Sequence, residues 1–156
     1  MIGILGAMSV EIDEIKSRVE GKTIETAGGF AFVRGRLGGK DVVAAECGIG
    51  KVNAAVCAQT MILTYKPELI VNVGVGGSLN PALRYGDMAI ADKVVQHDFD
   101  TSPIGDPVGL VATVNRVYFE CDPEVAACVK AVVDDMDGVN GMVGTIASGD
   151  QFVAEA

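Results

Sequence analysis

Glu11 is the residue whose type and position point most directly to chemistry. A short apolar run, residues 1–6, ends in glycine and is typical of a buried strand, and apolar residues at helical spacing begin at Met8. Glu11 therefore falls in the first turn of a predicted helix, where the helix dipole favours a carboxylate. A carboxylate held there could take a proton from water as a general base. The alternative is a glutamate that only satisfies free backbone N–H groups of the helix.

Two glycine-rich segments follow predicted strands and could bring backbone close to a ligand. Residues 48–51 (Gly-Ile-Gly-Lys) lie between a strand and a helix but lack the rest of either phosphate-binding pattern, and close packing of the helix on the strand explains their glycines equally well. Residues 74–78 (Gly-Val-Gly-Gly-Ser) carry three glycines in four positions, which allows backbone to approach a flat ligand. A tight turn without a ligand is the alternative for this segment.

The segment 148–153 (Ser-Gly-Asp-Gln-Phe-Val) is the last candidate. Phe152 comes just past a predicted strand, where an aromatic ring could stack on a base, and a buried core phenylalanine is the competing interpretation. His97, the only histidine, is followed by Asp98, but the nucleophile elbow of a serine hydrolase, Gly-x-Ser-x-Gly, does not occur in the sequence. A structural histidine at a strand end is favoured.

Strands alternate with helices along the chain, which predicts an α/β fold with a mostly parallel central sheet flanked by helices. Ser9 is expected to cap the first helix and Gly21 to end it. The second helix, 51–65, is apolar almost all round and is expected to be largely buried, and a third begins with Asp122 as cap and Pro123 at the first position. The predicted strands are 1–6, 23–27, 30–37, 41–46, 69–73, 87–97 with a bend, and 141–147.

Ligands of such sheets bind at the carboxyl ends of the strands. We therefore expect a site among residues 6–11, 48–51, 74–78 and 148–153. The long loop 98–114, rich in Pro, Gly and Asp, is of the kind that is usually functional or mobile.

The composition narrows the classes of partner. The chain has 156 residues, a net charge of −9 and no cluster of Lys or Arg, which argues against nucleic acid as a partner. Four cysteines without a CxxC pair, together with one histidine, argue against a metal site. The start of the chain lacks the features of a signal peptide, and no apolar run is long enough to span a bilayer. We expect a cytoplasmic protein of one domain, residues 1–156, with no cofactor and no membrane partner.

Five motifs, in order along the whole chain, resemble those of the bacterial 5′-methylthioadenosine/S-adenosylhomocysteine nucleosidases, a family of the nucleoside phosphorylase superfamily. Residues 3–11 are similar to the family's opening Gly-(apolar)₂-Gly-Ala-Met-x-x-Glu, and residues 48–55 to its Gly-Ile-Gly-Lys-Val-x-Ala-Ala helix start. Residues 72–79 resemble its Asn-x-Gly-x-x-Gly-x-Leu loop, residues 97–100 its His-Asp-x-Asp, and residues 148–152 its Ser-Gly-Asp-x-Phe. Together they are far more specific than any one alone.

The resemblance implies a role for each matching residue. Glu11 would be the base for the attacking water, and Phe152 would stack on the purine. A small-molecule nucleoside would be the substrate, in a homodimer whose subunits complete each other's sites. The remaining substrate-binding residues would be Met8 and Val75 at the ribose and thioether, Ile49 at the alkylthio tail, Gly76, Gly77 and Val153 at the purine, and Gln151. Thr101 and Ile104 would reach the partner subunit's site.

The same resemblance implies hydrolysis of the N-glycosidic bond of methylthioadenosine and S-adenosylhomocysteine, with release of adenine. Phosphorylases of this fold place an arginine near the first strand end, whereas this stretch carries Glu11 and no basic residue before Lys16. A carboxylate there would repel phosphate and activate water. Purine nucleoside phosphorolysis is the alternative activity.

Two departures from the family pattern qualify this expectation. Val75 stands where many members carry serine, so that a side-chain hydrogen bond is lost. The family continues beyond the position of Ala156 with a Val-Glu-Met-Glu segment and a Ser-Asp pair, which bind the ribose and protonate the leaving purine. We therefore expect the C-terminal portion to be missing and the 156-residue chain alone to be inactive. A non-catalytic module that binds nucleosides or dimerises is the alternative from a different class.

Overall fold

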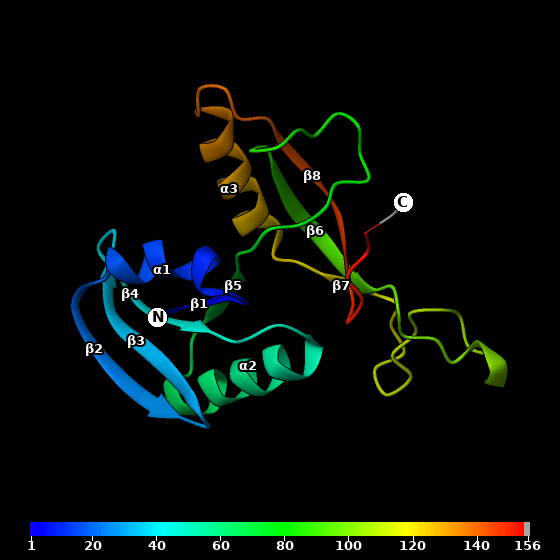
Figure 1. The fold of residues 1–156 in the computed structure, drawn as a ribbon, viewed down its shortest axis with the longest axis horizontal. Helices are drawn as coiled ribbons and strands as arrows, with labels where there is room; N and C mark the ends of the chain where they lie inside the picture. The colour runs from blue at the N-terminus through cyan, green and yellow to red at the C-terminus, as the bar shows by residue number, and fades with distance from the viewer. Residues whose placement is uncertain (155–156) are drawn as a thin grey trace. The chain divides into compact units, whose positions relative to one another are not determined.

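The computed structural model describes residues 1–154, which divide between two compact units that meet in the chain at Gly76 and Gly77. Each unit is built around its own sheet, with two helices packed on the first sheet and one on the second, as Figure 1 shows. The α/β class expected from the sequence is confirmed, and both sheets are mixed. No helix among the described residues is long and apolar enough to cross a membrane.

The first unit contains a five-stranded sheet in the order β2-β3-β4-β1-β5. β1 (Ile2–Gly6) lies between β4 (Lys40–Glu46) and β5 (Leu69–Asn72) and is parallel to both. β2 (Glu20–Ala27), β3 (Phe30–Leu37) and β4 pair antiparallel as two hairpins. The parallel half of this sheet therefore carries three strands whose carboxyl ends lie along one edge.

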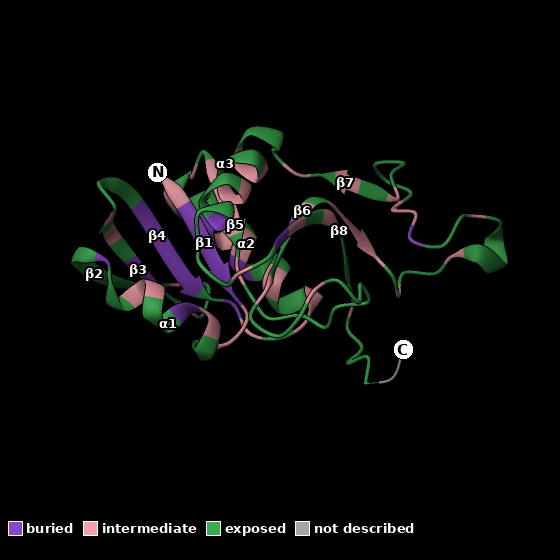
Figure 2. Ribbon diagram, turned by 90° about the horizontal axis from the view of Figure 1, so that it is seen from above, coloured by how far each residue is buried: buried purple, intermediate pink, exposed green. Residues whose placement is uncertain are grey.

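Two helices cover opposite faces of this sheet. The helix α1 (Ser9–Ser17) buries Ile12 against the face that carries Val42 and Ala44. The helix α2 (Lys51–Tyr65) contributes two buried side chains to the other face, which carries the alternate β4 residues. β4 and β1 each carry four consecutive buried residues, as the purple stretches in Figure 2 show.

The start and end of α1 differ from the sequence prediction. Met8, not Ser9, is the N-cap residue, and the helix ends at Ser17 with Arg18 as the C-cap residue. Gly21 instead lies within β2. The Glu11 side chain provides the reason at the start, since it accepts from the backbone N–H of Met8 at 2.9 Å and so takes the part of a capping side chain.

The helix α2 has the predicted bounds, but the prediction that it is largely buried is wrong for this chain. Only Cys57 and Met61 are buried, whereas Val52 is 73% and Leu63 69% exposed. A helix packed on one side of a sheet can bury only one stripe of its surface, and α2 is apolar on the remaining sides as well.

The second unit contains a three-stranded sheet in the order β7-β6-β8. β6 (Met88–Gln96) is antiparallel to β7 (Tyr118–Glu120) and parallel to β8 (Gly141–Ser148), and its register shifts between Ala91 and Lys93, where the sequence predicted a bend. The helix α3 (Pro123–Asp134) connects β7 to β8.

The start of α3 confirms the predicted cap. Asp122 Oδ1 accepts from the backbone N–H groups of Glu124 and Val125 at 2.9 and 3.1 Å, and Pro123 follows it at the first helical position. The segment between β6 and β7 is the long loop of the prediction, and its one short helical turn is η1 (Ser102–Ile104).

Candidate active site

The carboxylate of Glu11 is held by three backbone N–H groups of the first unit. Glu11 Oε2 accepts from Ala7 at 2.7 Å and from Met8 at 2.9 Å, while Oε1 accepts from Val75 at 2.9 Å. A carboxylate can accept about four hydrogen bonds. Among the described residues, these three donors leave an accepting position on Oε1, where a water molecule or a hydroxyl group can bind.

The parallel strands of the first unit place these groups together. Gly6 is the register partner of Glu46, and Leu5 that of Asn72, so that β1, β4 and β5 end along one edge. The ladder continues past the strand ends, because the Val73 N–H donates to the Leu5 carbonyl at 2.8 Å. The predicted segments 6–11, 48–51 and the first part of 74–78 therefore share one edge of the sheet.

Gly74 lets the Glu11 side chain approach the backbone closely. A Cβ atom at position 74 would lie 3.0 Å from Glu11 Oε1 and 3.4 Å from Glu11 Cδ, tighter than most real Cβ contacts. The absence of a side chain lets the backbone after β5 close onto the carboxylate. Gly74 therefore allows close contact between the loop and Glu11, a role that the sequence did not predict.

Apolar side chains are exposed near this carboxylate. Ile49 and Val75 are 72% and 75% exposed, and Met8, the N-cap residue of α1, is half-buried. The Ile49 carbonyl accepts from Asn53 Nδ2 at 2.8 Å, which fixes the turn that leads into α2. The exposed edge of the first unit thus combines one fixed carboxylate with apolar side chains and the backbone of Gly76.

The second unit carries the remaining predicted site residues. Phe152 is 96% and Val153 61% exposed, so the interpretation of Phe152 as a buried core residue is wrong. Gln151 is exposed beside them. These three residues come shortly after the end of β8 at Ser148, as the sequence predicted, and Gly77 begins the unit. Their convergence with Glu11 on one site stays a prediction.

The loop between β6 and β7 holds the two residues predicted to reach a partner subunit. Thr101 Oγ1 donates to Asp106 Oδ2 at 3.0 Å, which spans the turn of η1, and Ile104 at its end is 80% exposed. The loop projects from the three-stranded sheet (Figure 1). An exposed branched apolar residue at its tip fits a contact with another molecule.

The sequence profile of the phosphorylase superfamily matches residues 1–156. The chain belongs to the phosphorylase superfamily. Its similarity to the nucleosidases of this superfamily, inferred from five motifs, is confirmed: it is 38% identical, over 98% of its length, to the 5′-methylthioadenosine/S-adenosylhomocysteine nucleosidase of Marinomonas sp. (strain MWYL1), of which the match covers 66%.

Solved structures of the phosphorylase superfamily give the same result. The nucleosidase of Colwellia psychrerythraea in complex with adenine superposes with a TM-score of 0.93 and 30% identity, over 97% of this chain and 62% of that one. The nucleosidase of Neisseria meningitidis in complex with methylthio-immucillin-A has a TM-score of 0.93 and 32% identity, over 97% and 65%. The chain therefore spans slightly less than two thirds of the length of these relatives.

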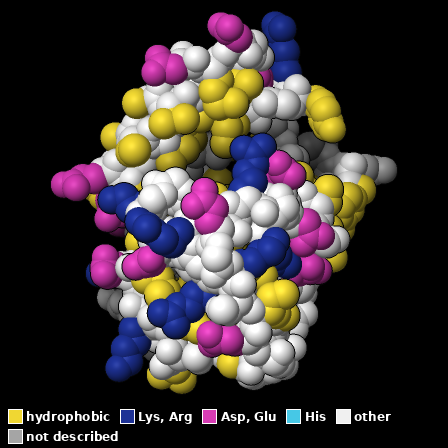
Figure 3. Space-filling model, turned by 90° about the vertical axis from the view of Figure 1, so that its left-hand side faces the viewer, with side chains coloured by type: hydrophobic (Ala, Val, Ile, Leu, Met, Phe, Trp, Pro, Cys, Tyr) yellow, Lys and Arg dark blue, Asp and Glu magenta, His cyan; other side chains and the backbone are white. Residues whose placement is uncertain are grey.

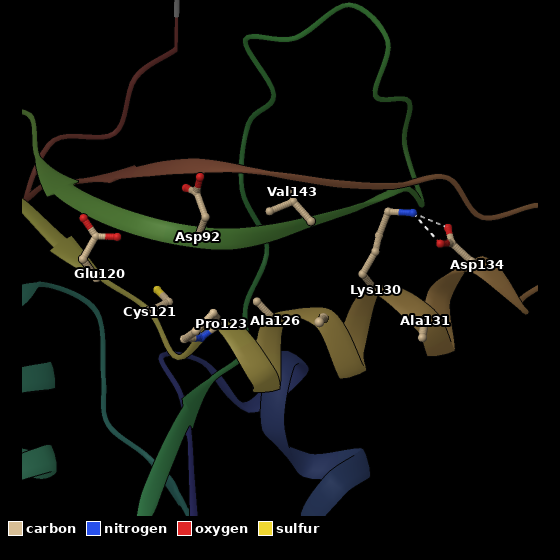
Figure 4. A pocket seen from close by; sticks show the side chains of 10 residues that line it. Asp92, Glu120, Cys121, Pro123, Ala126, Lys130, Ala131, Asp134 and Val143 are labelled. Atoms are coloured by element: carbon tan, nitrogen blue, oxygen red, sulfur yellow. Dashed lines mark hydrogen bonds and ion pairs between the residues drawn. The ribbon is translucent and has the colours of Figure 1, made fainter.

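One cavity of this phosphorylase-superfamily chain is lined by none of the predicted site residues. It measures about 730 Å³ and lies in the second unit between α3 and the sheet, with Asp92, Glu120 and Cys121 at one end and the Lys130–Asp134 ion pair at the other (Figure 4). Burial raises the pKa of the Cys121 thiol, and the nearby Asp92 and Glu120 charges raise it further. A thiol kept protonated in this way is a poor nucleophile.

Proposed function

We propose that the complete protein hydrolyses the N-glycosidic bond of 5′-methylthioadenosine and S-adenosylhomocysteine and releases adenine. The observation that carries the proposal is the Glu11 carboxylate, fixed by three backbone N–H groups at the carboxyl ends of β1 and β5 with an accepting position on Oε1. Such a group can orient water and take its proton. The nucleosidase names of the similar proteins support the same reaction.

In the proposed reaction, the bond between the purine nitrogen and the sugar carbon breaks as the sugar gains oxocarbenium character, and the water oxygen bonds to that carbon. The proton of the water passes to Glu11. Because the sugar carbon is then strongly electrophilic, the water requires only modest activation once the leaving group departs. Within residues 1–154 we assign no acid for the leaving purine, and we expect it to come from residues beyond this chain.

Phosphorolysis, the alternative activity, needs an anion site in the same place. The start of a helix with free N–H groups is such a site. In this chain the N–H groups of Ala7 and Met8 at the start of α1 are already taken by the Glu11 carboxylate, and Val75 donates to the same group. A phosphate ion would meet a negative charge instead of donors, so water is the better nucleophile for this site.

The proposed roles of the other residues follow their chemistry. Met8, Ile49 and Val75 offer apolar surface for the ribose and the alkylthio group, and Gly76 and Gly77 let backbone lie near the purine. Phe152 is free to stack on the base, with Gln151 and the Val153 backbone at its edge. The exposed apolar positions of the first unit, 72% for Ile49 and 75% for Val75, support a thioether substrate over a more polar one.

A homodimer is part of the proposal. The exposed apolar side of α2, with Val52 and Leu63, offers an interface, and Thr101 and Ile104 would reach the partner subunit's site. Light scattering of the complete protein tests this assembly. A monomer at micromolar concentration would contradict it.

The decisive experiment compares Glu11→Gln with Glu14→Gln in the complete protein. Glu14 lies on the same helix, is exposed and pairs only with Arg18 among the contacts described, so its variant controls for the loss of one charge. Adenine release from methylthioadenosine should fall by roughly 10²–10⁴-fold in Glu11→Gln, the usual share of a general base, and stay near wild type in the control. Wild-type turnover in Glu11→Gln would show the hydrolase proposal to be wrong.

The same assay separates the alternatives. Adenine release that does not change between phosphate-free buffer and added phosphate, with free ribose-type sugar as the second product, is expected for the nucleosidase. A strict need for phosphate would identify a phosphorylase. Binding of methylthioadenosine without release of adenine by the complete protein would identify the non-catalytic module.

A further inference from the structure

The carboxyl ends of β6 and β8 lie side by side and then separate into the two segments that carry the proposed binding residues of the second unit. Gln96 is the register partner of Ser148, and the His97 N–H donates to the Ser148 carbonyl at 3.0 Å. Beyond this point, β6 continues into the loop with Thr101 and Ile104. β8 continues into residues 149–153, which we call the base segment.

A further hydrogen bond holds the base segment to the end of β6. The backbone N–H of Asp150 donates to Asp98 Oδ2 at 2.7 Å. Asp98 is half-buried, whereas Phe152, two residues past Asp150, is almost fully exposed. Packing against the described residues therefore cannot fix the Phe152 ring, and its position depends on how the backbone at 149 and 150 is held.

Gly149 shows how close this contact is. A Cβ atom at position 149 would lie 2.8 Å from Asp98 Cγ and would overlap the His97 imidazole ring. Real Cβ atoms do not approach other atoms so closely, so a Cβ atom here would force the His97 ring and the Asp98 carboxylate to shift. Glycine lets the end of β8 pass against the His97–Asp98 pair as they lie. The ring and the carboxylate together form the surface on which the base segment lies.

We propose that Asp98 and His97 are positioning residues that hold the base segment in place for the purine. The inference rests on the proposed function, because Phe152 and Val153 are the residues proposed to bind the base. Asp98 orients the backbone through Asp150, and His97 supports Gly149. Both act through the base segment and not by contact with the nucleoside.

The same pair also begins the loop proposed to reach the partner subunit. The Gly109 N–H donates to the Phe99 carbonyl at 2.7 Å, which closes the loop one residue after Asp98. The loop therefore begins directly after the residue whose carboxylate holds the base segment.

The test compares Asp98→Ala with Asp98→Asn in the complete protein. Alanine removes the acceptor of the Asp150 N–H, whereas asparagine retains one acceptor oxygen. Asp137→Ala, at an exposed turn after α3, removes the same charge without touching the base segment and serves as the control. Three quantities are measured: amide hydrogen exchange in residues 149–153, affinity for 2-aminopurine from quenching of its fluorescence, and kcat and KM for methylthioadenosine.

We expect exchange in the base segment to accelerate in Asp98→Ala and the affinity for 2-aminopurine to fall about 5- to 100-fold, the range of one lost base–aromatic stack. KM should rise more than kcat falls, and Asp98→Asn should recover most of each change. A general loss of stability would instead accelerate exchange throughout the unit and would not be rescued by asparagine.

A second pair of variants tests the contact at His97. Gly149→Ala places a methyl group against the imidazole ring and should weaken 2-aminopurine binding, and adding His97→Ala should restore part of the affinity by making room. Failure of the double variant to improve on Gly149→Ala would overturn the role of His97.

The outcomes separate this inference from the proposed function. Wild-type protein that neither binds 2-aminopurine nor releases adenine overturns both. Wild-type protein that does both, while Asp98→Ala leaves exchange or affinity unchanged, overturns the inference alone. Faster exchange confined to the base segment, with weaker binding and rescue by asparagine, supports it.

Discussion

The two units of the chain differ in both charge and burial. Of the 21 acidic residues, 8 lie in the first unit and 13 in the second, whereas the 12 basic residues divide 8 to 4, so the first unit has no net charge and the second carries −9. On the molecular face drawn in Figure 3, positively charged Lys and Arg side chains alternate with negatively charged Asp and Glu side chains. Of the described apolar residues that are buried, 13 belong to the first unit, and only Ile90 and Val133 belong to the second.

This difference fits the roles that the proposed function gives to the residues of each unit. The first unit has a core that can hold Glu11 rigidly, as a catalytic group requires. The second unit offers exposed apolar residues on loops and strand ends, held by a few hydrogen bonds such as that of Asp98 with Asp150. Segments with few buried contacts open at low free energy, and binding segments are commonly of this kind.

The largest expected effect is on the core of the first unit. Phe32 is fully buried and packs with Phe30 and Tyr65, so Phe32→Ala should lower the free energy of unfolding by about 3–5 kcal/mol. Val133→Ala, the matched change in the second unit, removes less apolar surface and should cost about 1–2 kcal/mol. Urea unfolding followed by NMR signals from each unit measures both. A larger effect of Val133→Ala would reverse the comparison.

The next effect concerns the rigidity of Glu11. Gly74→Ala places a methyl group 3.0 Å from Glu11 Oε1, and the carboxylate or the loop must shift, so the Val75 hydrogen bond should weaken. Turnover by the complete protein should fall roughly tenfold, since one hydrogen bond to a charged group contributes about 1.5–3 kcal/mol and only part of it is lost. Gly144→Ala, in β8, has open space at its Cβ and is the control. Equal turnover of the two variants would mean that the carboxylate tolerates displacement.

Much of the fold could be predicted from local sequence patterns. Apolar runs bounded by glycine or proline predicted β3 and the bounds of α2 correctly. Asp122 before Pro123 predicted the start of α3. These features depend on neighbouring residues only. The N-cap at Met8 could not be predicted from local patterns. The Glu11 side chain accepts from the Met8 N–H and also from the Val75 N–H, 64 residues away. That contact depends on β1 lying next to β5, and the order of strands in a sheet cannot be predicted from local periodicity.

The candidate site was predicted to a similar extent. Glu11 and the exposed Phe152 could be found because each follows a predicted strand end. The role of Gly74 against the Glu11 carboxylate and that of Asp98 against Asp150 could not, because both join segments that are more than 50 residues apart in sequence. The burial of α2 was overestimated for a related reason, since apolar composition does not say which sides of a helix find a partner.

Two groups, one in each unit, should make stability depend on pH in opposite directions. Burial raises the pKa of Cys57 in the first unit from 9.0 to about 11, so the folded state holds this proton more tightly than the unfolded chain. The stability due to this group is complete below pH 9.0 and is lost as pH rises toward about 11.

In the second unit the backbone N–H groups of Arg84 and Asn140 lower the pKa of Asp87 from its ordinary 3.8. The stability due to Asp87 is present above pH 3.8 and is lost as pH falls below it. NMR signals along a pH series should therefore show an alkaline loss of stability in the first unit that includes Cys57, and an acid loss in the second unit that includes Asp87. The Cys121 thiol, whose pKa is also raised, adds an alkaline loss to the second unit. Replacing Cys57 by Ala should remove part of the alkaline response and leave the acid response unchanged.

The smallest expected effect is that of salt, and it bears most directly on the charge difference. Like charges in the second unit repel one another over distances comparable with the Debye length, which is about 10 Å at 0.1 M salt and about 3 Å at 1 M. Raising NaCl should therefore slow amide exchange in β6 and β8, by an amount equivalent to about 1 kcal/mol or less, as for other surface charge interactions. β1 and β4, in a unit with no net charge, should change little and serve as the internal reference. The double variant Asp135→Asn, Asp137→Asn makes the second unit less negative by two charges and should reduce the salt effect there. An equal response of both units, or one that these substitutions leave unchanged, would mean that salt acts through general solvation and that the acidic charge of the second unit does not set its stability.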